Sequence, residues 1–353
     1  MNHIKGELDD RLTEAALRNV VFLIGAGFSR SISQAMPVMA DLGDRISKRL
    51  GSPFGKQFRH HLAVFGNDVE EVLAFLYSPP PYVETEVSLE HQALATRVVA
   101  AIRDEIVDAE RSATETDPPG WLQSLIRWWH KHRTRIVTLN YDSLIERAAL
   151  PLLHTDTNGD YTPESSLAAP LPPVAMRTGG TWGRTRVESF TLAKLHGSAS
   201  WYWPQSRSGP ADPIYLDHPA TWPGGQAPAV DAAYRLAGLE PAIVPPLGAK
   251  DELISNLTLR AQWQAAKRNP SIVVICGYSL PASDRLVRQL LAERWGRANI
   301  VVADIDVTMP QHIAECMRAV PRSGIPEDAE RFVLQANPLD PMPDLVGWLE
   351  SVG

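Results

Sequence analysis

The sequence predicts an α/β fold in which helices cover both faces of a mainly parallel, doubly wound β-sheet. Three observations lead to this prediction: short apolar runs typical of buried strands, helical patterns between them, and glycine or polar residues directly after the runs. Strands covered on both faces are nearly continuous in Val and Ile, and alternation of strand and helix is typical of parallel sheets. We therefore expect a Rossmann-like sheet as the framework of the chain.

Five apolar runs are predicted to be the strands of this sheet. They comprise residues 19–24, 135–139, 190–195, 271–276 and 299–303, and the last two are almost entirely valine and isoleucine. Helical patterns follow three of them, at residues 143–150, 253–267 and 284–295. More than a hundred residues separate the first two runs, which is too long for one crossover. The residues between these two runs have helical patterns at 40–50, 69–77, 89–109 and 121–132.

The domain organisation follows from this spacing. We expect a single domain over residues 1–353, with a helical insertion at residues 54–132 between the first and second strands. Residues 151–186 and 204–226 are rich in proline and glycine, so they are predicted to be long surface loops or lids. The aromatic segment 121–130 has helical spacing, which fits core packing at least as well as a subunit interface.

Composition excludes several classes of protein. The chain has 34 Lys and Arg against 41 Asp and Glu, a net charge of −7, which argues against direct binding of nucleic acid over a broad basic face. Its two cysteines, Cys276 and Cys316, form no zinc-binding pair, and Cys276 is expected to be a small buried hydrophobe. We expect no signal peptide, because the N-terminal residues are polar and acidic, and no membrane span, because no apolar run reaches the ~18 residues required. We expect a cytoplasmic protein without bound metal.

A glycine-rich turn follows the first apolar run in VVFLIGAGFSRS, residues 20–31. Glycine is unfavourable inside a strand or helix, so Gly25 and Gly27 indicate that something approaches the backbone closely. Backbone N–H groups at such a turn can hold a pyrophosphate. The motif departs from G-x-G-x-x-G because residue 30 is arginine. A tight strand-to-helix turn is the alternative explanation.

Two further runs end in polar residues. TLNYDSLIE, residues 138–146, places Asn140 at the end of the second strand, and either Asp142 or Ser143 is expected to cap the next helix, with Ser143 and Glu146 at capping-box spacing. KLHGSASWYW, residues 194–203, places His196 at the end of the third strand. Histidine is the side chain best suited to proton transfer near neutral pH, although a structural role is the more common one at such a position. The aromatic residues that follow are expected to be core.

The last two predicted strands end in a similar way. CGYSLPASD, residues 276–284, has Gly277 and Ser279 after the strand and Pro281 in what we expect to be the first turn of a helix. This segment is interpreted as a second phosphate-facing turn. Asp304 follows the fifth strand, where a carboxylate can hold ribose hydroxyls or lie in a solvated loop. The carboxyl ends of parallel strands share one edge of a sheet, so we expect these groups to form a single site.

Together, and in this order, GAGFS, TLNYD, KLHGS and GYSLPASD resemble the sirtuin-like domain of bacterial anti-phage defence proteins, relatives of the NAD-dependent protein deacylases. The resemblance extends over nearly the whole chain and implies that NAD⁺ is the substrate. It implies that Asn140 and His196 are the catalytic pair. It assigns the pyrophosphate to Gly25, Ala26, Gly27, Ser29, Gly277 and Ser279, the nicotinamide ribose to Asp142 and the adenosine ribose to Asp304.

Two departures favour hydrolysis of NAD⁺ to nicotinamide and ADP-ribose over deacylation. Two cysteines cannot supply the four-cysteine zinc module of the deacylases, and the acidic–aromatic–arginine segment after their glycine turn is replaced here by AMPVMADL, residues 35–42. Because uncontrolled loss of NAD⁺ is lethal, we expect activity gated by homo-oligomerisation or by a protein partner. The family implies a hexameric DNA-translocating ATPase or a short Argonaute. A non-catalytic NAD or ADP-ribose sensor, an assembly protein and a protein ADP-ribosyltransferase are the alternatives.

Overall fold

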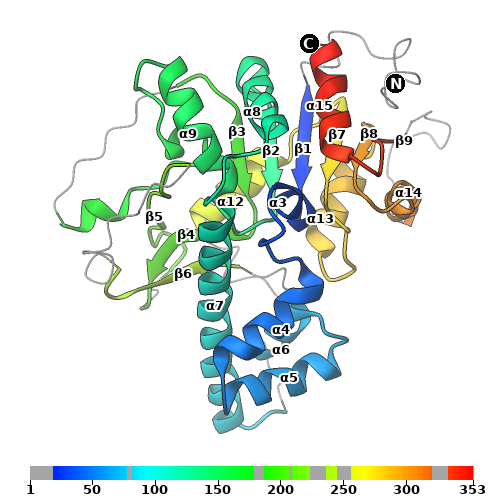
Figure 1. Cartoon of the computed structure of the whole chain (residues 1–353). Helices are drawn as coiled ribbons and strands as arrows, with labels where there is room; N and C mark the ends of the chain where they lie inside the picture. Colours follow the sequence, from blue (N-terminus) through cyan, green and yellow to red (C-terminus); the bar gives the residue numbers. More distant parts are fainter. Residues whose placement is uncertain are drawn as a thin grey trace.

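A six-stranded parallel sheet forms the centre of the computed structural model (Figure 1). The structure describes residues 19–77, 82–178, 187–206, 209–222, 236–244, 256–319 and 333–352. The sheet confirms the predicted α/β class, and all five predicted strands are present. A short sixth strand at the edge, β9, was not predicted. The six strands of the sheet are β1 (Val20–Ile24), β2 (Arg135–Thr138), β3 (Thr191–Lys194), β7 (Ile272–Cys276), β8 (Asn299–Ala303) and β9 (Val333–Gln335).

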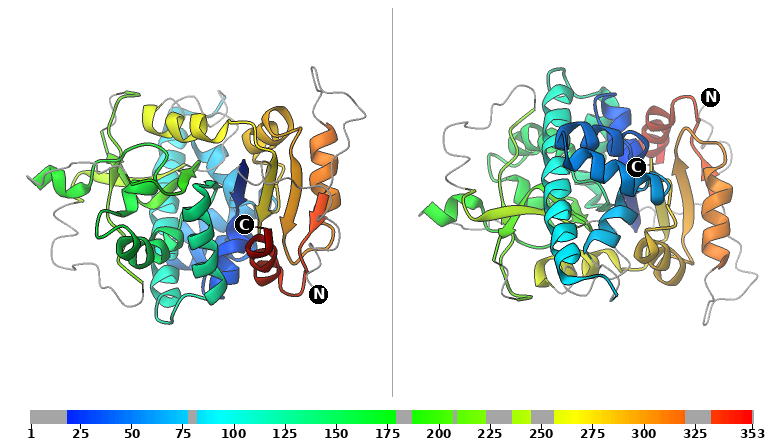
Figure 2. Two further views of the ribbon diagram at one scale, coloured as in Figure 1. Left: turned by 90° about the horizontal axis from the view of Figure 1, so that it is seen from above. Right: turned by 90° about the horizontal axis from the view of Figure 1, so that it is seen from below.

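Both faces of the sheet are buried, as the apolar runs require. Alternate side chains of β1 enter different cores: Phe22 and Ile24 belong to one cluster, Val21 and Leu23 to the other. Figure 2 views the sheet from its two ends and shows helices on both sides. One face is covered by α8 (Gly120–His132), α9 (Leu144–Asp156) and α15 (Pro341–Val352), and the other by α12 (Leu257–Ala266), α13 (Arg285–Gln289) and α14 (Met309–Ala319).

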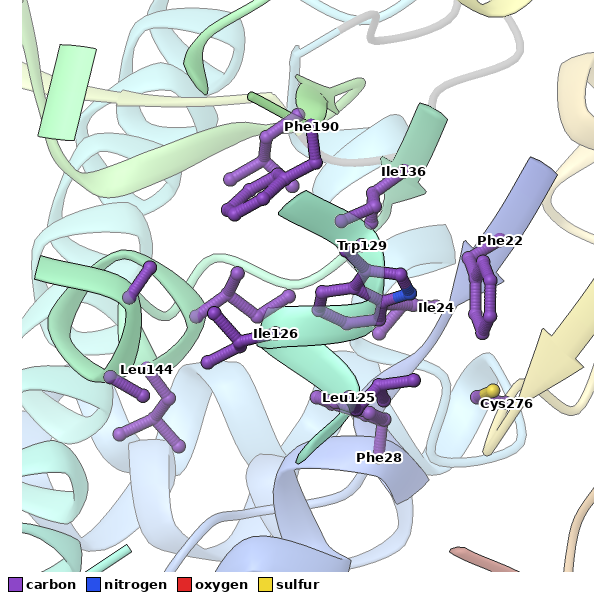
Figure 3. Close-up of a cluster of buried hydrophobic side chains, with 14 of the residues drawn as sticks. Phe22, Ile24, Phe28, Leu125, Ile126, Trp129, Ile136, Leu144, Phe190 and Cys276 are labelled. Carbon is purple, nitrogen blue, oxygen red and sulfur yellow. The ribbon is translucent and has the colours of Figure 1, made fainter. Parts of the chain in front are cut away.

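The first of these cores is centred on Trp129 of α8 (Figure 3). Its ring contacts Phe22 edge-on at 5.2 Å between centroids and stacks near Phe28 at 6.3 Å. Phe28 belongs to α3 (Ala26–Ile32), a short helix that starts directly after β1, as the alternative of a tight strand-to-helix turn predicted. The core interpretation of the aromatic segment is therefore confirmed for Trp129, and the same packing holds the glycine turn against α8.

Four of the helices between β1 and β2 pack around a third core, to which Ala199 and Ile243 also contribute. Figure 1 places this helical group at the end of the molecule toward which the strands of the sheet point. Its apolar side chains include Ile46, Phe58 and Val72. The group consists of α4 (Met39–Leu50), α5 (Phe54–Val64), α6 (Val69–Tyr77) and α7 (Thr85–Ala113), of which α5 was not predicted. The division of the chain at residues 54–132 stays a prediction.

A second, antiparallel sheet was not predicted. It has the order β5-β4-β6, with β4 (Gly197–Pro204) between β5 (Tyr215–Leu216) and β6 (Leu239–Ile243). Trp201, Tyr202 and Trp203 of β4 are buried, so their predicted place in the core is confirmed. Pairing between β4 and β6 depends on segments distant in sequence. That is the reason period-2 patterns did not find it.

Local predictions were wrong at three places. Helix α9 continues through Pro151 to Asp156, so the predicted loop 151–186 starts too early, and its residues 179–186 lie outside the described part. The predicted loop 204–226 contains β5, with residues 207–208 and 223–226 not described. Pro281 precedes α13 by four residues instead of lying in its first turn. Among the described residues, no helix has the length and apolar character that crossing a bilayer requires.

Candidate functional site

A cavity of about 690 Å³ lies between the carboxyl ends of the parallel strands and the helical group. This volume is in the range of sites for small molecules, ~300–1,000 Å³. The helical group contributes Met39, Leu42 and Ile106 to its lining. All ten residues singled out from the sequence line it: Gly25, Ala26, Gly27, Ser29, Asn140, Asp142, His196, Gly277, Ser279 and Asp304.

The cavity lies at the topological switch point of the sheet. The spatial order is β3-β2-β1-β7-β8-β9, so the chain builds outward from β1 in one direction and, from β7 on, in the other. When only the strands of this sheet are counted, the order is 3-2-1-4-5-6, the order found in sheets that bind dinucleotides at the reversal. Gly25 follows β1 and Gly277 follows β7, so the two glycine turns lie on either side of the switch point.

The two glycine turns contact each other directly. A Cβ atom added to Gly25 would lie 2.7 Å from the carbonyl oxygen of Gly277, and one added to Gly277 would lie 2.2 Å from the backbone nitrogen of Phe28. Gly277 also has a φ of 56°, which disfavours other residues. The close approach inferred from the sequence is therefore at least partly that of one turn to the other.

Backbone hydrogen bonds close this corner. The Gly25 N–H donates to the Cys276 carbonyl (3.0 Å) and the Gly27 N–H to the Gly277 carbonyl (2.8 Å). Two of the N–H groups that the sequence assigned to a pyrophosphate are thus used within the chain. Gly25, Gly27 and Gly277 shape the cavity wall through packing, and their role in holding a ligand stays a prediction.

A buried hydrogen-bond chain connects Asn140 to Asp142 through Ser29. The Asn140 amide donates from Nδ2 to the Gly25 carbonyl and to Ser29 Oγ, both at 2.9 Å, and Ser29 Oγ donates to Asp142 Oδ2 at 2.6 Å. Carbonyl and carboxylate oxygens only accept, so the direction of every bond is determined. Ser29 has no proton left for a phosphate, and Asn140 Oδ1 is the amide atom that can accept from a ligand or water.

The loop that carries Asn140 and Asp142 is held by two buried charged residues. Lys194, fully buried, donates to the Asp142 carbonyl (2.5 Å) and to Glu146 Oε1 (2.9 Å). Asp142 Oδ1 accepts the N–H of Leu144 in the first turn of α9 (3.2 Å). The predicted capping box between Ser143 and Glu146 is wrong, because Glu146 pairs with Lys194 instead.

Glu110 of α7 takes the place of that capping box. Its carboxylate accepts the N–H of Ser143 (2.5 Å) and the Ser143 hydroxyl (2.9 Å), and it pairs with Arg147 at 3.0 Å. Burial raises the pKa of Glu110 above its usual value, and the attraction of Arg147 opposes this shift without cancelling it. Helix α7 therefore positions the start of α9 and, with it, the candidate site.

His196 lines the cavity beside groups that were not singled out from the sequence. It follows β3 in a turn before β4 and is 3% exposed. Its Nε2 is 3.9 Å from Asp284 Oδ1, and its ring lies 6.4 Å from that of Tyr141. Tyr278 donates its hydroxyl to Asp284 Oδ2 at 2.7 Å. Asp284, Tyr141 and Tyr278 all occur within the motifs, but no local pattern indicates that they meet.

Glu70 of α6 also lines the cavity beside these tyrosines. Its Oε2 accepts a hydrogen bond from Ser283 Oγ (3.3 Å), which connects the helical group to the loop after β7. Burial, and next the negative charge of Glu70 and Asp284, raise the pKa of Tyr141 well above its usual value, and burial raises that of Tyr278 in the same direction. Both tyrosines therefore keep their protons at neutral pH, and Tyr278 donates its proton to Asp284.

The cavity is acidic. Arg30 is the one arginine or lysine among the described residues that line it, and it pairs with Asp41. The lining carboxylates are Asp68, Glu70, Asp142, Asp284, Asp304, Asp306 and Asp340. Burial raises the pKa of Asp304, whose carboxylate accepts the Asp306 N–H at 2.9 Å. An anionic group of a ligand is favoured beside Arg30, and a cationic group elsewhere in the cavity.

Neither a protein-family model nor a curated protein matches the chain. In the part of the chain that the structure describes, no group of three or more His, Cys, Asp and Glu side chains is arranged to hold a metal ion. The site is thus defined by its own geometry: a switch-point cavity lined by the hydrogen-bond chain from Asn140 to Asp142 and by the His196 imidazole with several carboxylates.

Proposed function

We propose that the chain is an NAD⁺ glycohydrolase, which cleaves the bond between nicotinamide and ribose to release nicotinamide and ADP-ribose. The observation that carries the proposal is the convergence of Asn140 and His196 on one cavity at the switch point of a sheet with the strand order of dinucleotide-binding folds. The motif resemblance to sirtuin-like defence domains supports the same substrate. The cellular role that follows is depletion of NAD⁺ as a gated response to phage.

The cavity extends over the ends of several strands, which suits an elongated ligand. His196 follows β3 and Asp304 follows β8, four strand positions away. Neighbouring strands lie ~4.8 Å apart, so these ends are about 19 Å from each other along the sheet edge. We place the nicotinamide end of NAD⁺ at Asn140 and His196, the pyrophosphate beside Arg30, and the adenosine ribose at Asp304.

The chemistry requires little from an acid catalyst. Nicotinamide leaves with the electron pair of the C–N bond and becomes neutral, while the ribose passes through an oxocarbenium-like transition state. Asn140 Oδ1, whose orientation is set by the bonds of Nδ2, accepts a hydrogen bond from the attacking water. His196 takes the proton that this water loses as its oxygen bonds to the anomeric carbon, a contribution of ~10²–10⁴ in rate.

Release of nicotinamide from NAD⁺ by the purified full chain tests the proposal. Wild type, Asn140→Ala and His196→Ala are assayed at several protein concentrations, because an assembly-gated enzyme gains specific activity on concentration. We expect nicotinamide from the wild type and a loss of at least about 10²-fold in either variant. His154→Ala removes an exposed imidazole of α9 outside the cavity and is expected to leave the rate unchanged.

Binding separates this function from its alternatives. His196→Ala is expected to bind NAD⁺ in calorimetry without consuming it. Binding by the wild type without nicotinamide release, also inside cells that overproduce it, identifies a sensor instead. Transfer of label from NAD⁺ to protein identifies an ADP-ribosyltransferase. Absence of both binding and release overturns the assignment of NAD⁺ as ligand.

A further inference from the structure

The Asp284 side chain occupies an unusual position for its place in the chain. It is the residue before the first turn of α13, where aspartate commonly accepts N–H groups of the helix, yet its side chain makes no capping bond. The carboxylate is 2% exposed and lines the cavity. It is turned toward Tyr278, which donates to Oδ2, and toward His196, whose Nε2 is 3.9 Å from Oδ1.

The side chains around His196 are mostly negatively charged or neutral. Asp284 from the loop before α13 and Glu70 from α6 carry the carboxylates. Tyr141 from the loop after β2 and Tyr278 from the loop after β7 are protonated phenols at neutral pH, because burial raises their pKa values. Arg288 of α13 is a cation close to Tyr278, and its charge opposes the rise in the pKa of Tyr278. Its Nη1 donates to the Leu280 carbonyl at 3.2 Å.

We propose that Asp284 is a positioning residue that acts through His196, held in place by the hydroxyl of Tyr278. The carboxylate stabilises the imidazolium that forms when His196 accepts the proton of the attacking water, and it keeps the imidazole oriented toward the reacting ribose. The proton later passes to solvent, so that water and NAD⁺ yield ADP-ribose, nicotinamide and one proton. This inference rests on the proposed NAD⁺ hydrolysis.

Geometry supports an electrostatic role for Asp284. At 3.9 Å the carboxylate is within the ~4–6 Å at which an opposite charge favours the protonated form of a neighbour. Both side chains are at most 3% exposed, so solvent screens the pair little. Asp284 and Tyr278 belong to the same loop, and their bond of 2.7 Å restricts the carboxylate before any ligand binds.

A titration of His196 followed by NMR tests the inference without NAD⁺. The His196 ring signal is assigned by its loss in His196→Gln. In Asp284→Asn the midpoint of this titration is expected to move to lower pH by about one unit or more, because the opposite charge is removed. Asp44→Asn removes an exposed carboxylate of α4 and is expected to leave the midpoint unchanged. Should Asp284→Asn fail to fold, Asp284→Ser removes the charge and keeps a residue that suits the position before a helix.

Kinetics then measure the role in the reaction. In Asp284→Asn, kcat is expected to fall about 10- to 100-fold with little change in KM, and the acidic limb of the pH–rate profile to move to lower pH in parallel with the NMR midpoint. A folded variant with an unmoved His196 titration overturns the inference. If Asp284→Asn lowers the midpoint of the His196 titration as expected but the wild type releases no nicotinamide, the proposed function is overturned. The titration still shows whether Asp284 controls His196.

Discussion

Two groups of residues that line the cavity, the glycine turns and the side chains around His196, differ in the atoms through which they make contact. At the glycine corner, Gly25, Gly27 and Gly277 meet through backbone atoms, and their amides donate to carbonyls of neighbouring strand ends. In the neighbouring group, His196 and Asp284 face each other through side chains, with no direct hydrogen bond between them. The glycine turns leave no room for an added Cβ atom, whereas the group around His196 consists of titratable side chains that line the cavity.

This difference separates architecture from chemistry. The glycines that first drew attention to the site explain how β1 and β7 can end side by side. The residues suited to proton transfer come instead from the loops after β2, β3 and β7, brought together by the helices that pack around them. Substitutions in the glycine turns are therefore expected to affect stability, and substitutions in the group around His196 are expected to affect turnover.

The largest effect is expected from Gly277→Ala. The added Cβ would lie 2.2 Å from the Phe28 nitrogen, and the φ of 56° is itself unfavourable for alanine. Backbone has to move, so we expect a loss of about 3 kcal/mol or more in the free energy of unfolding. Gly66→Ala is the matched control: its φ is 63° with open space around it, and ~1 kcal/mol is expected. Similar urea midpoints for the two variants would contradict the close packing of the glycine turns.

Glu110→Ala ranks next. It leaves the buried N–H of Ser143 without its acceptor and removes the carboxylate that pairs with Arg147, whose Nε still donates to Ser143 Oγ; breaking such a pair costs about 3 kcal/mol. Asp108→Ala, on the same helix, removes an exposed pair with Arg49 and Arg111, for which under ~1 kcal/mol is expected. Thermal and urea unfolding compare the two. Equal losses would mean that α7 does not support the loop of the candidate site.

Ser29→Ala tests what the buried serine does. If it only orients Asn140, kcat falls at least about tenfold while KM changes little, because the amide loses one of its two fixed partners. If it holds the pyrophosphate as the sequence indicated, KM rises instead. Ser33→Ala, at the C-terminal end of the same helix and not among the residues that line the cavity, removes a hydroxyl that accepts the Ala35 N–H at 3.3 Å and is expected to change neither constant. Steady-state kinetics with NAD⁺ distinguish these outcomes.

The smallest effect is expected from Arg30→Met. Loss of one charged hydrogen bond to a phosphate weakens binding by about 1.4 kcal/mol, a rise of about tenfold or less in KM with kcat retained. Arg45→Met is the control, because Arg45 pairs with the same Asp41 from outside the cavity. Unchanged affinity for NAD⁺ in calorimetry would place the pyrophosphate away from Arg30.

Local pattern was sufficient for part of the fold. The apolar runs at β1, β2, β3, β7 and β8 are short, bounded by glycine or polar residues, and each is a strand. A helix after the first glycine turn was one of two predicted alternatives, but its bounds were not predicted, because AGFSRSI has no helical apolar pattern and is held by packing of Phe28 against Trp129. Strands β5 and β6 were missed because they are stabilised by pairing with β4 and not by a pattern of their own.

The sequence predicted which residues line the candidate site better than it predicted the role of each residue. Every residue singled out lines one cavity, because parallel strands bring their carboxyl ends to one edge. The roles of individual groups were not accessible in this way. Ser29 and the amides of Gly25 and Gly27 had been assigned to a ligand but are bonded within the chain, and Glu70 and Asp284 were not assigned at all.

The amino-acid sequence alone thus determined where the strands lie and which chemical groups follow them, since both depend on residues adjacent in the chain. Only the tertiary structure decided which of these groups remain available to a ligand. That depends on hydrogen bonds and burial between segments far apart, such as Ser283 with Glu70, 213 residues away. Nothing in the periodicity of either segment records the partner that it meets after folding.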